Sequence, residues 1–276
     1  MFDPSSTWPV LLTFVALAGI CGGFLAGLLG VGGGIVIVPL LELAFTGAGV
    51  DRDVTMHLAV ATSMATIVPT SISSSRAHAR RGAIDHATVR RWAPWIVGGA
   101  LLGALVASQL DGRVLAFVFA ALALAVAARM VLAPQIPQRP QEAAGSGRGG
   151  AAVPLAIGLL SALLGIGGGT MSVPALTMRG LPIHAAVGTA ARLGLWISLP
   201  ATVGFMLAQP PRELTPALSI GYVHLPAFAL VAVLTWFSAP WGARLAHRAG
   251  RRVLTAAFAA FLFAVALRML LRAYGQ

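Results

Sequence analysis

Two segments of this chain, at residues 27–39 and 162–174, carry the same glycine-rich pattern. They read GLLGVGGGIVIVP and ALLGIGGGTMSVP and are identical at eight of thirteen positions. Glycine in a helix interior costs about 1 kcal/mol relative to alanine, so three in a row should end or unwind an apolar helix. We expect such a break at two sets of residues: Gly32, Gly33 and Gly34, and Gly167, Gly168 and Gly169.

An unwound segment presents backbone N–H groups, which can bind an anion. In hydrocarbon these groups must face protein or a water-filled cavity, where they act together with the positive end of the next half-helix. Thr170 would add a hydroxyl donor. The alternative is close helix packing, a usual role of small residues in membranes. Because the pattern occurs twice, and Pro39 or Pro174 follows each copy, we favour substrate binding by the glycines and Thr170, with the prolines as hinges.

The composition indicates that these segments lie in a membrane. Of 276 residues, 58% are hydrophobic and only 10% are charged, too few charges to cover a soluble surface. Apolar runs such as 92–110 and 114–132 are long enough to cross a bilayer as helices. The net charge of +11 reflects arginines bunched between such runs, a pattern typical of membrane topology rather than nucleic-acid binding. We therefore interpret the chain as an all-α polytopic membrane protein.

The glycine motifs divide the chain into two related halves. We assign residues 1–132 to a first transmembrane repeat, 133–152 to a flexible cytoplasmic linker rich in Pro, Gly and Gln, and 153–276 to a second repeat. The segment HLAVATSMA, which begins at His57, corresponds to HAAVGTAAR, which begins at His184. Duplicated halves are common in secondary transporters, which bind their substrate where the repeats meet.

The charges predict how the two halves are oriented. After its glycine motif each half holds three apolar spans, at 54–75, 92–110 and 114–132 and at 181–208, 216–237 and 253–272. If each motif forms a re-entrant helical hairpin, the basic loops 76–91 and 238–252 and the linker all lie inside the cell, as the positive-inside rule requires. The predicted fold is therefore two inverted repeats, each of one glycine-interrupted hairpin and three transmembrane helices, with the N-terminus outside.

One arginine lies within a predicted span rather than in a loop. Arg192 stands where the equivalent residue of the first half is Ala65, and a charge inside the membrane is costly, so Arg192 is a candidate substrate contact. Its guanidinium suits a sulfonate or a carboxylate. Thr62 and Thr189 occupy equivalent positions in the two halves, close in their helices to Ala65 and Arg192 respectively, and are expected to line the same site. The alternative for such hydroxyls is a bond to their own helix backbone.

The remaining residues of interest are two prolines and three titratable groups. Pro69 and Pro200 should kink their helices and free carbonyl groups. Glu42 either carries a coupling proton or marks the edge of its hairpin. His57 and His184 begin equivalent helices and either titrate near neutral pH or serve as caps. The sequence shows no metal-ligand spacing and no cofactor motif.

These segments resemble a known family. The resemblance to the sulfite exporter TauE/SafE family, also called the toluenesulfonate uptake permease family, lies in LLGVGGGIVIVP and LLGIGGGTMSVP and in RRGAIDHATVRRWAPWIVGGALLGALVAS and PWGARLAHRAGRRVLTAAFAAFLFAVALRML. It covers nearly the whole chain and implies a secondary transporter, not an enzyme, that moves sulfite, sulfoacetate or other sulfonates across the bacterial inner membrane. An anion channel and a carrier of other carboxylates stay alternatives. The expected partners are a small anion and the lipid bilayer but no nucleic acid, and homo-oligomer formation stays open.

Cysteine-accessibility labelling of intact cells tests the predicted topology. Single cysteines in 76–91, 133–152 and 238–252 should react only with reagents that enter the cytoplasm, because basic loops are retained inside. Cysteines at the N-terminus and in 209–215 should react from outside. Outside labelling of 238–252 would contradict the inverted arrangement and favour parallel repeats.

Overall fold

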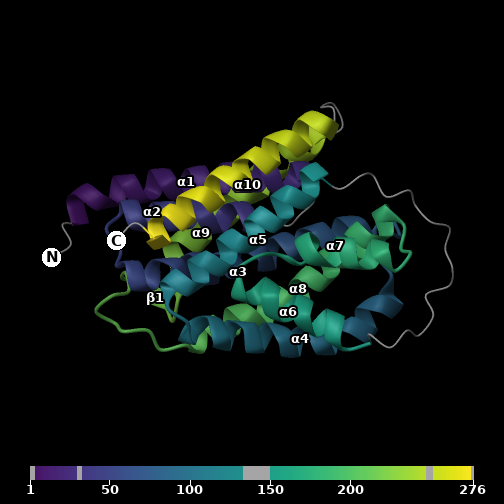
Figure 1. The fold of residues 1–276 in the computed structure, drawn as a ribbon, viewed down its shortest axis with the longest axis horizontal. Helices are drawn as coiled ribbons and strands as arrows, with labels where there is room; N and C mark the ends of the chain where they lie inside the picture. The colour runs from purple at the N-terminus through teal and green to yellow at the C-terminus, as the bar shows by residue number, and fades with distance from the viewer. Residues whose placement is uncertain (1–3, 30–32, 133–149, 247–250, 275–276) are drawn as a thin grey trace.

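The computed structural model describes residues 4–29, 33–132, 150–246 and 251–274. Within these ranges the chain forms ten α-helices and one short antiparallel hairpin (Figure 1), so the all-α class predicted from the sequence is confirmed. The first half holds α1 (Pro4–Leu29), α2 (Gly34–Gly47), α3 (Arg52–Ala79), α4 (His86–Gln109) and α5 (Gly112–Leu132). The second half holds α6 (Ala152–Leu163), α7 (Gly168–Met178), α8 (Ile183–Leu207), β1 (Ser219–Ile220), β2 (Val223–His224), α9 (Leu225–Ala246) and α10 (Arg251–Tyr274).

Both glycine motifs interrupt a helix, as the sequence predicts. The first break separates α1 from α2, and Gly33 precedes α2 with a left-handed φ of 74°. The second break separates α6 from α7, and Gly165 within it has a φ of 68°. Residues with a side chain rarely adopt this conformation, so glycine lets the chain turn there without strain. The two hairpins differ in their first arm, since α1 has 26 residues and α6 has 12.

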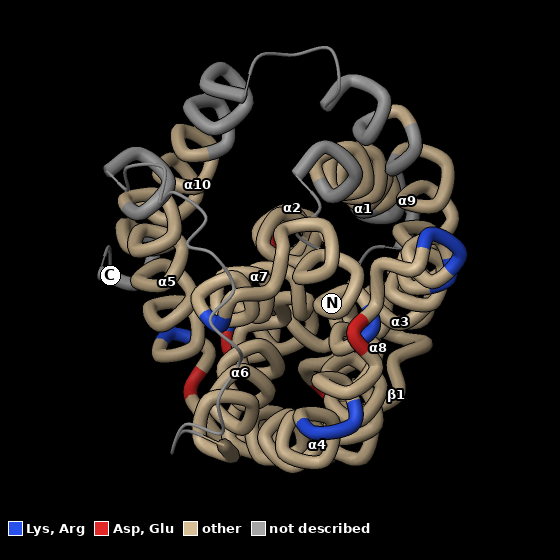
Figure 2. The backbone as a smooth tube through the Cα atoms, turned by 90° about the vertical axis from the view of Figure 1, so that its right-hand side faces the viewer, with Lys and Arg blue, Asp and Glu red and all other residues tan. Residues whose placement is uncertain are grey.

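The two halves pack against each other through reciprocal helix pairs. α1 packs along α9, and its counterpart α6 packs along α4. In the same way, the α2–α3 pair of the first half corresponds to the α7–α8 pair of the second, and the α3–α9 pair corresponds to α8–α4. The α3–α8 and α5–α10 pairs each join a helix to its own counterpart in the other half. Figure 2 shows the α1–α9 pair and the α5–α10 pair on opposite sides of α2. Each half therefore buries helices of the other.

Five of the six predicted spans overlap helices closely, and the sixth is wrong at its start. The span 216–237 was expected to be helical throughout, but α9 begins at Leu225. The apolar residues before it form the β1–β2 hairpin, in which Ile220 pairs with Val223. Leu218 and Gly221 have φ angles of 63° and 56°, outside the right-handed helical region, so no α-helix can run through them.

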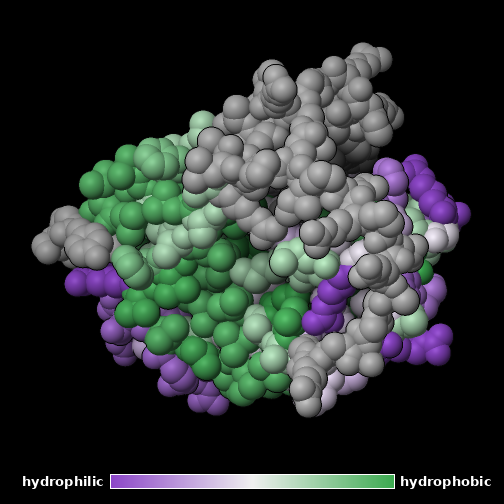
Figure 3. Space-filling model, turned by 45° about the vertical axis from the view of Figure 1, so that its right-hand side comes forward, coloured by the Kyte–Doolittle hydropathy of each residue, from purple (hydrophilic) through white to green (hydrophobic). Residues whose placement is uncertain are grey.

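The surface of the described residues is that of a protein embedded in lipid. α4 and α8 are each long and apolar enough to cross a bilayer, over the residues whose side chains are described. Apolar residues form a broad band in Figure 3, and hydrophilic residues gather on either side of it. Large apolar side chains such as Leu105 and Trp236 are more than half exposed, at 56% and 58%. An apolar surface of this extent needs a partner, and hydrocarbon supplies it.

Small residues allow α4 and α6 to approach each other closely. A Cβ atom added to Gly99 would fall on the carbonyl oxygen of Leu155, and one added to Gly158 would fall on that of Ile96. The neighbouring Gly98 has no atom within 4 Å of the corresponding position. Close approach through small residues is a usual form of helix packing in membranes.

The α4–α6 contact predicts a difference between two adjacent glycines. Gly99→Ala should lower the free energy of unfolding by about 1–3 kcal/mol, because the added methyl group must displace the backbone of α6. Gly98→Ala is the matched control in the same helix and should be neutral or stabilise by up to about 1 kcal/mol. Thermal unfolding of both variants in one detergent compares them. A melting temperature of Gly99→Ala equal to that of Gly98→Ala would contradict the close contact.

Candidate functional site

The tips of the two hairpins meet inside the molecule. A Cβ atom on Gly34, the first residue of α2, would fall on the carbonyl oxygen of Gly165 and lie 3.0 Å from the Cα atom of Ile166. The Ser63 hydroxyl of α3 donates a hydrogen bond of 2.9 Å to the same carbonyl oxygen. The structure therefore brings the two glycine motifs into direct contact, with buried residues of α3 beside them.

The second hairpin also packs closely against α8. A Cβ atom on Gly168, the first residue of α7, would lie 2.8 Å from the backbone nitrogen of Gly194 and 3.0 Å from the carbonyl oxygen of Ala190. A Cβ atom on Gly194 would in turn lie 2.8 Å from Oγ of Ser71 in α3. Close packing, the alternative interpretation of the motif glycines, is thus an observed role of Gly34 and Gly168.

Two helices begin where the two glycine motifs meet. The first N–H groups of a helix have no acceptor within the helix, and the helix dipole makes this end positive. α2 begins at Gly34 and α7 at Gly168, and the preceding residues, Gly33 and Gly167, have no side chain that could cap these ends. Gly169 is the second residue of α7. N–H donors of both helices therefore lie close to the place where the hairpins meet.

Buried serine hydroxyls lie one turn from the glycines at the contact. Ser172 follows Gly168 by four residues in α7, and Ser198 follows Gly194 by four residues in α8. Among the described residues the Oγ atoms of both serines are buried and have no hydrogen-bond partner. A buried hydroxyl without a partner costs free energy, and a ligand that accepted its hydrogen bond would offset that cost. Sequence reasoning assigned neither serine to the site, although a hydroxyl one turn after a glycine was a signal that could have found them.

Thr62 and Thr189 hold residues of the opposite half. Thr62 Oγ1 in α3 accepts a hydrogen bond of 3.1 Å from the backbone N–H of His224, the residue before α9. Thr189 Oγ1 in α8 accepts one of 2.9 Å from the backbone N–H of Asp85, the N-cap of α4. Both threonines are fully buried. We call these bonds the α3 latch and the α8 latch, and the expectation that the threonines bind substrate stays a prediction.

The two residues held by the latches also cap their helices. The Asp85 carboxylate accepts hydrogen bonds from the backbone N–H groups of Ala87 and Thr88 and one of 2.6 Å from the Thr88 hydroxyl. Partial burial opposes ionisation of Asp85, but the bonds from Thr88 and Ala87 prevail and lower the pKa of its carboxyl group. His224 Nδ1 accepts a hydrogen bond of 3.2 Å from the backbone N–H of Ala227. Each latch therefore joins a hydroxyl of one half to a helix cap of the other.

Arg192 lies on a different face of α8 from the residues that contact the second glycine motif. Residues two apart in a helix are separated by about 200° around its axis, so Arg192 faces the opposite side of α8 from Ala190 and Gly194. It shares its face with Trp196 and Leu199, whose side chains are 42% and 50% exposed. Among the described residues its Nε atom is buried and has no hydrogen-bond partner. The assignment of Arg192 to the substrate stays a prediction, and this packing does not favour it.

Glu42 is buried in α2 and forms an ion pair with the other half. Its Oε2 atom lies 2.7 Å from Nη1 of Arg268 in α10, and its Oε1 atom accepts a hydrogen bond of 3.1 Å from the Thr46 hydroxyl. The side chain of Arg268 is 34% exposed. Glu42 thus lies inside the molecule, and its arginine partner, 226 residues away, could not be predicted from the local sequence.

The two equivalent histidines have different surroundings. His57 is buried, with Nδ1 3.0 Å from the carbonyl oxygen of Asp53 and Nε2 2.9 Å from that of Leu110. Its ring stacks on Tyr222, with the ring centroids 4.8 Å apart. His184 is exposed at the start of α8. His57 therefore joins α3 to the α4–α5 turn and to the β1–β2 hairpin, whereas His184 faces outward.

The remaining predicted residues are prolines within helices and two residues of the glycine motifs. The prolines are Pro39 in α2, Pro69 in α3, Pro174 in α7 and Pro200 in α8. Each lacks the N–H that would bond to the carbonyl one turn earlier, so it frees an acceptor inside its helix. Thr170 is half-buried near the start of α7. Gly32 lies outside the described residues.

The fold and the site define an all-helical membrane protein in which two glycine-broken hairpins meet between related halves. The family model described as sulfite exporter TauE/SafE matches residues 15–269. The chain belongs to this family, and it is a membrane transporter rather than an enzyme. The resemblance inferred from the glycine motifs is confirmed.

Relatives in distant organisms share almost the whole chain. A probable membrane transporter protein of Haemophilus influenzae is 35% identical over 268 residues, which cover 95% of this chain and 100% of the relative. The probable membrane transporter protein YunE of Bacillus subtilis is 28% identical, over 85% of this chain and 89% of its own length. The probable membrane transporter protein MJ0441 of Methanocaldococcus jannaschii is 26% identical, over 95% and 96%. No solved structure matches the chain.

The latches predict that two buried hydroxyls stabilise the fold. Thr62→Val and Thr189→Val should each lower the free energy of unfolding by about 1–3 kcal/mol, because a buried N–H loses its acceptor. Thr70→Val is the matched control, since this hydroxyl bonds only to carbonyl groups of its own helix among the described residues. Thermal unfolding of the three variants makes the comparison. The latches contribute nothing if all three variants unfold at one temperature.

Proposed function

We propose that this transporter moves small sulfur-containing or organic anions, such as sulfite, sulfoacetate or other sulfonates, which bind near the membrane midplane between the two halves. The contact between the glycine motifs carries this proposal, because α2 and α7 both begin there, at Gly34 and Gly168, without a side-chain cap. Helix N-termini with unpaired N–H groups favour anions. The Ser172 and Ser198 hydroxyls, which have no partner among the described residues, supply further donors. The family description, which names a sulfite exporter, supports a sulfur oxyanion.

The proposal treats the halves as inverted repeats of a multi-pass protein in the bacterial inner membrane. The reciprocal helix pairs support a two-fold relation between the halves. Exposed arginines gather around the α3–α4 turn, where Figure 2 shows blue segments on the end of the molecule that faces the viewer. A basic turn of this kind is retained on the cytoplasmic side, which supports placing that end inside the cell.

The two latches suggest how the site would open to one side at a time. Asp85, held by the α8 latch, precedes α4, whereas Leu110 follows it. His57 links Leu110 to Tyr222, which lies two residues before His224 of the α3 latch. The latches therefore lie toward opposite ends of α4. Breaking one while the other holds would separate the halves at one end only, as alternating access requires.

The coupling ion acts on titratable groups that connect the halves. Glu42 is the leading group, because its protonation would weaken the ion pair with Arg268 and so loosen α2 from α10. His57 joins three elements at one end of the bundle, and its protonation would change bonds there. His184 occupies the equivalent position of the second half and is exposed at the start of α8.

A binding experiment with purified protein tests the central site. Ser198→Ala should weaken sulfite binding about tenfold or more, because a hydrogen bond to a charged ligand contributes about 1.5–3 kcal/mol. Ser108→Ala is the matched control, since this exposed hydroxyl bonds to the Leu105 carbonyl of its own helix. Isothermal titration with sulfite, sulfoacetate and simple carboxylates ranks the substrates. Failure of the folded wild-type protein to bind any of these anions would contradict the proposal.

Arg192→Gln tests whether Arg192, which the sequence assigns to the same site as the glycine motifs, contacts the anion. With the anion at the glycine motifs, this variant should bind sulfite within about threefold of wild type, as for a side chain outside the site. A loss of about thirtyfold would instead place the anion at Arg192, because removing a buried charge partner costs about 2–5 kcal/mol. Counterflow in proteoliposomes distinguishes the carrier from the alternative of an anion channel, which shows none.

A further inference from the structure

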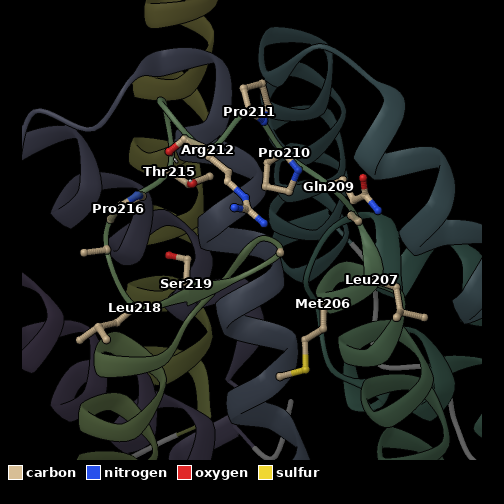
Figure 4. Close-up of a pocket in the computed structure, with 13 residues that line it drawn as sticks. Met206, Leu207, Gln209, Pro210, Pro211, Arg212, Thr215, Pro216, Leu218 and Ser219 are labelled. Carbon is tan, nitrogen blue, oxygen red and sulfur yellow. Dashed lines mark hydrogen bonds between the residues drawn. The ribbon is translucent and has the colours of Figure 1, made fainter.

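The long loop between α8 and α9 forms an opening separate from the glycine motifs (Figure 4). A cavity of about 980 Å³ lies between the end of α8 and this loop, residues 208–224. Its lining includes Met206 of α8 and Arg212, Thr215 and Ser219 of the loop. This volume is large enough for a small organic anion with part of its hydration shell.

The wall of this opening is fixed to the helices. The backbone N–H of Tyr222 donates a hydrogen bond of 3.1 Å to the Phe205 carbonyl at the end of α8, and that of Leu225 donates one of 3.1 Å to the Leu218 carbonyl. Gly221 lies so close to the Phe205 carbonyl that a Cβ atom would clash with it. Three prolines between residues 208 and 218 restrict the backbone further. A fixed wall keeps polar groups in place before a ligand arrives.

Two polar groups of this wall are free to bind a ligand. The guanidinium of Arg212 points into the middle of the opening in Figure 4, and Arg212 has no ion-pair partner among the described residues. The Oγ atom of Ser219 is buried and has no hydrogen-bond partner in the part of the chain that the structure describes. Glu213, next to Arg212, is exposed and does not line the cavity. Among the described residues, the opening thus presents one cation without an ion-pair partner and one hydroxyl without a hydrogen-bond partner.

We propose that this opening is a second anion site, which captures a small oxyanion before it reaches the glycine motifs. Arg212 supplies a full positive charge in a planar fork that matches a sulfonate, carboxylate or phosphate group, and Ser219 supplies a further donor. Its role in transport rests on the proposed function, but the binding itself does not.

A series of bonded residues connects the wall of the opening to the central contact. The β1–β2 hairpin, which carries Ser219, ends at His224, whose backbone N–H is bound to Thr62 in the α3 latch. The next residue of α3, Ser63, donates to Gly165 of the second glycine motif. An anion held at Arg212 therefore lies at the end of the bundle where breaking the α3 latch would open a way to the glycine motifs.

The test uses a sulfonate-bearing thiol reagent, 2-sulfonatoethyl methanethiosulfonate, on the full chain with Cys21→Ser. Ser219→Cys is labelled with this reagent and with its trimethylammonium analogue, and the ratio of the two rates is measured. Arg212→Gln should lower this ratio about tenfold, because a charge-assisted hydrogen bond is lost. Thr215→Cys, which lines the same cavity, repeats the measurement at a second position. A ratio unchanged by Arg212→Gln at both positions would overturn the proposal.

Arg113→Gln is the matched control for charge. Arg113 is an exposed arginine beside the α4–α5 turn, at the end of the bundle where Leu110 contacts His57, and it does not line the cavity. Its removal should change the ratio by no more than about twofold, as for a screened surface charge. A decrease equal to that of Arg212→Gln would show a general surface potential and overturn the assignment to Arg212.

Competition with free ethanesulfonate decides whether the site binds a free oxyanion or the headgroup of a lipid. Free ethanesulfonate should slow the labelling both in lipid-free detergent and in nanodiscs of phosphatidylcholine. If the labelling is slowed only when phosphatidylglycerol is present, the site binds a lipid headgroup, and its role in capturing a free oxyanion is overturned. Labelling does not depend on transport. If the labelling ratio depends on Arg212 but the protein transports no anion, only the proposed function is rejected. Normal sulfite transport with an unchanged ratio rejects this site alone.

Discussion

Backbone groups inside a membrane find no water, so every break in a helix must be satisfied by the protein itself. Among the described residues, the two glycine motifs provide such breaks before α2 and before α7, where the two halves meet. The Ser63 hydroxyl satisfies the Gly165 carbonyl in one break, and Gly34 of the other motif packs against the same carbonyl. Glycine is required at this contact because any side chain at Gly34 would push the two tips apart. The same breaks leave the starts of α2 and α7 without caps, and this connects the packing of the fold with binding of an anion.

Among the described residues, hydroxyl groups bond to backbone of the opposite half in several places. Ser63 binds the second glycine motif, Thr62 binds the residue before α9, and Thr189 binds the N-cap of α4. A single hydrogen bond contributes only about 0.5–1.5 kcal/mol net, so such a bond can break and reform during a transport cycle. An apolar interface of the same area would hold the halves together but would not define which groups separate at each end.

Local features of the fold were predictable from the sequence. Three glycines in a row break a helix wherever they occur, and a repeated motif implies repeated elements, so the two hairpins and most spans were found. The start of α9 was not predicted correctly, because a short apolar run suits a helix and a buried strand equally. Only the φ angles of Leu218 and Gly221 show that the residues before α9 are not helical.

The candidate site was predictable only in its backbone part. The glycines could be assigned because they act through their own conformation, whereas side-chain roles depend on which faces of the helices meet. Arg192 is a candidate substrate contact by sequence because it is charged within a span, yet in the structure it shares a face of α8 with exposed Trp196. The pairing of Glu42 with Arg268 joins residues 226 positions apart, and no local pattern encodes it. Ser198 follows Gly194 by one helical turn, but only its burial without a hydrogen-bond partner among the described residues distinguishes it from the other hydroxyls of α8.

The position of a bound anion tests this account most directly. Selenite is a heavier analogue of sulfite with strong anomalous scattering, so a crystal structure of the protein with selenite would locate it without ambiguity. We expect the anomalous peak within hydrogen-bond distance of the Ser198 hydroxyl and of a backbone nitrogen at the start of α2 or α7. A peak beside Arg192, with none where the glycine motifs meet, would contradict the account.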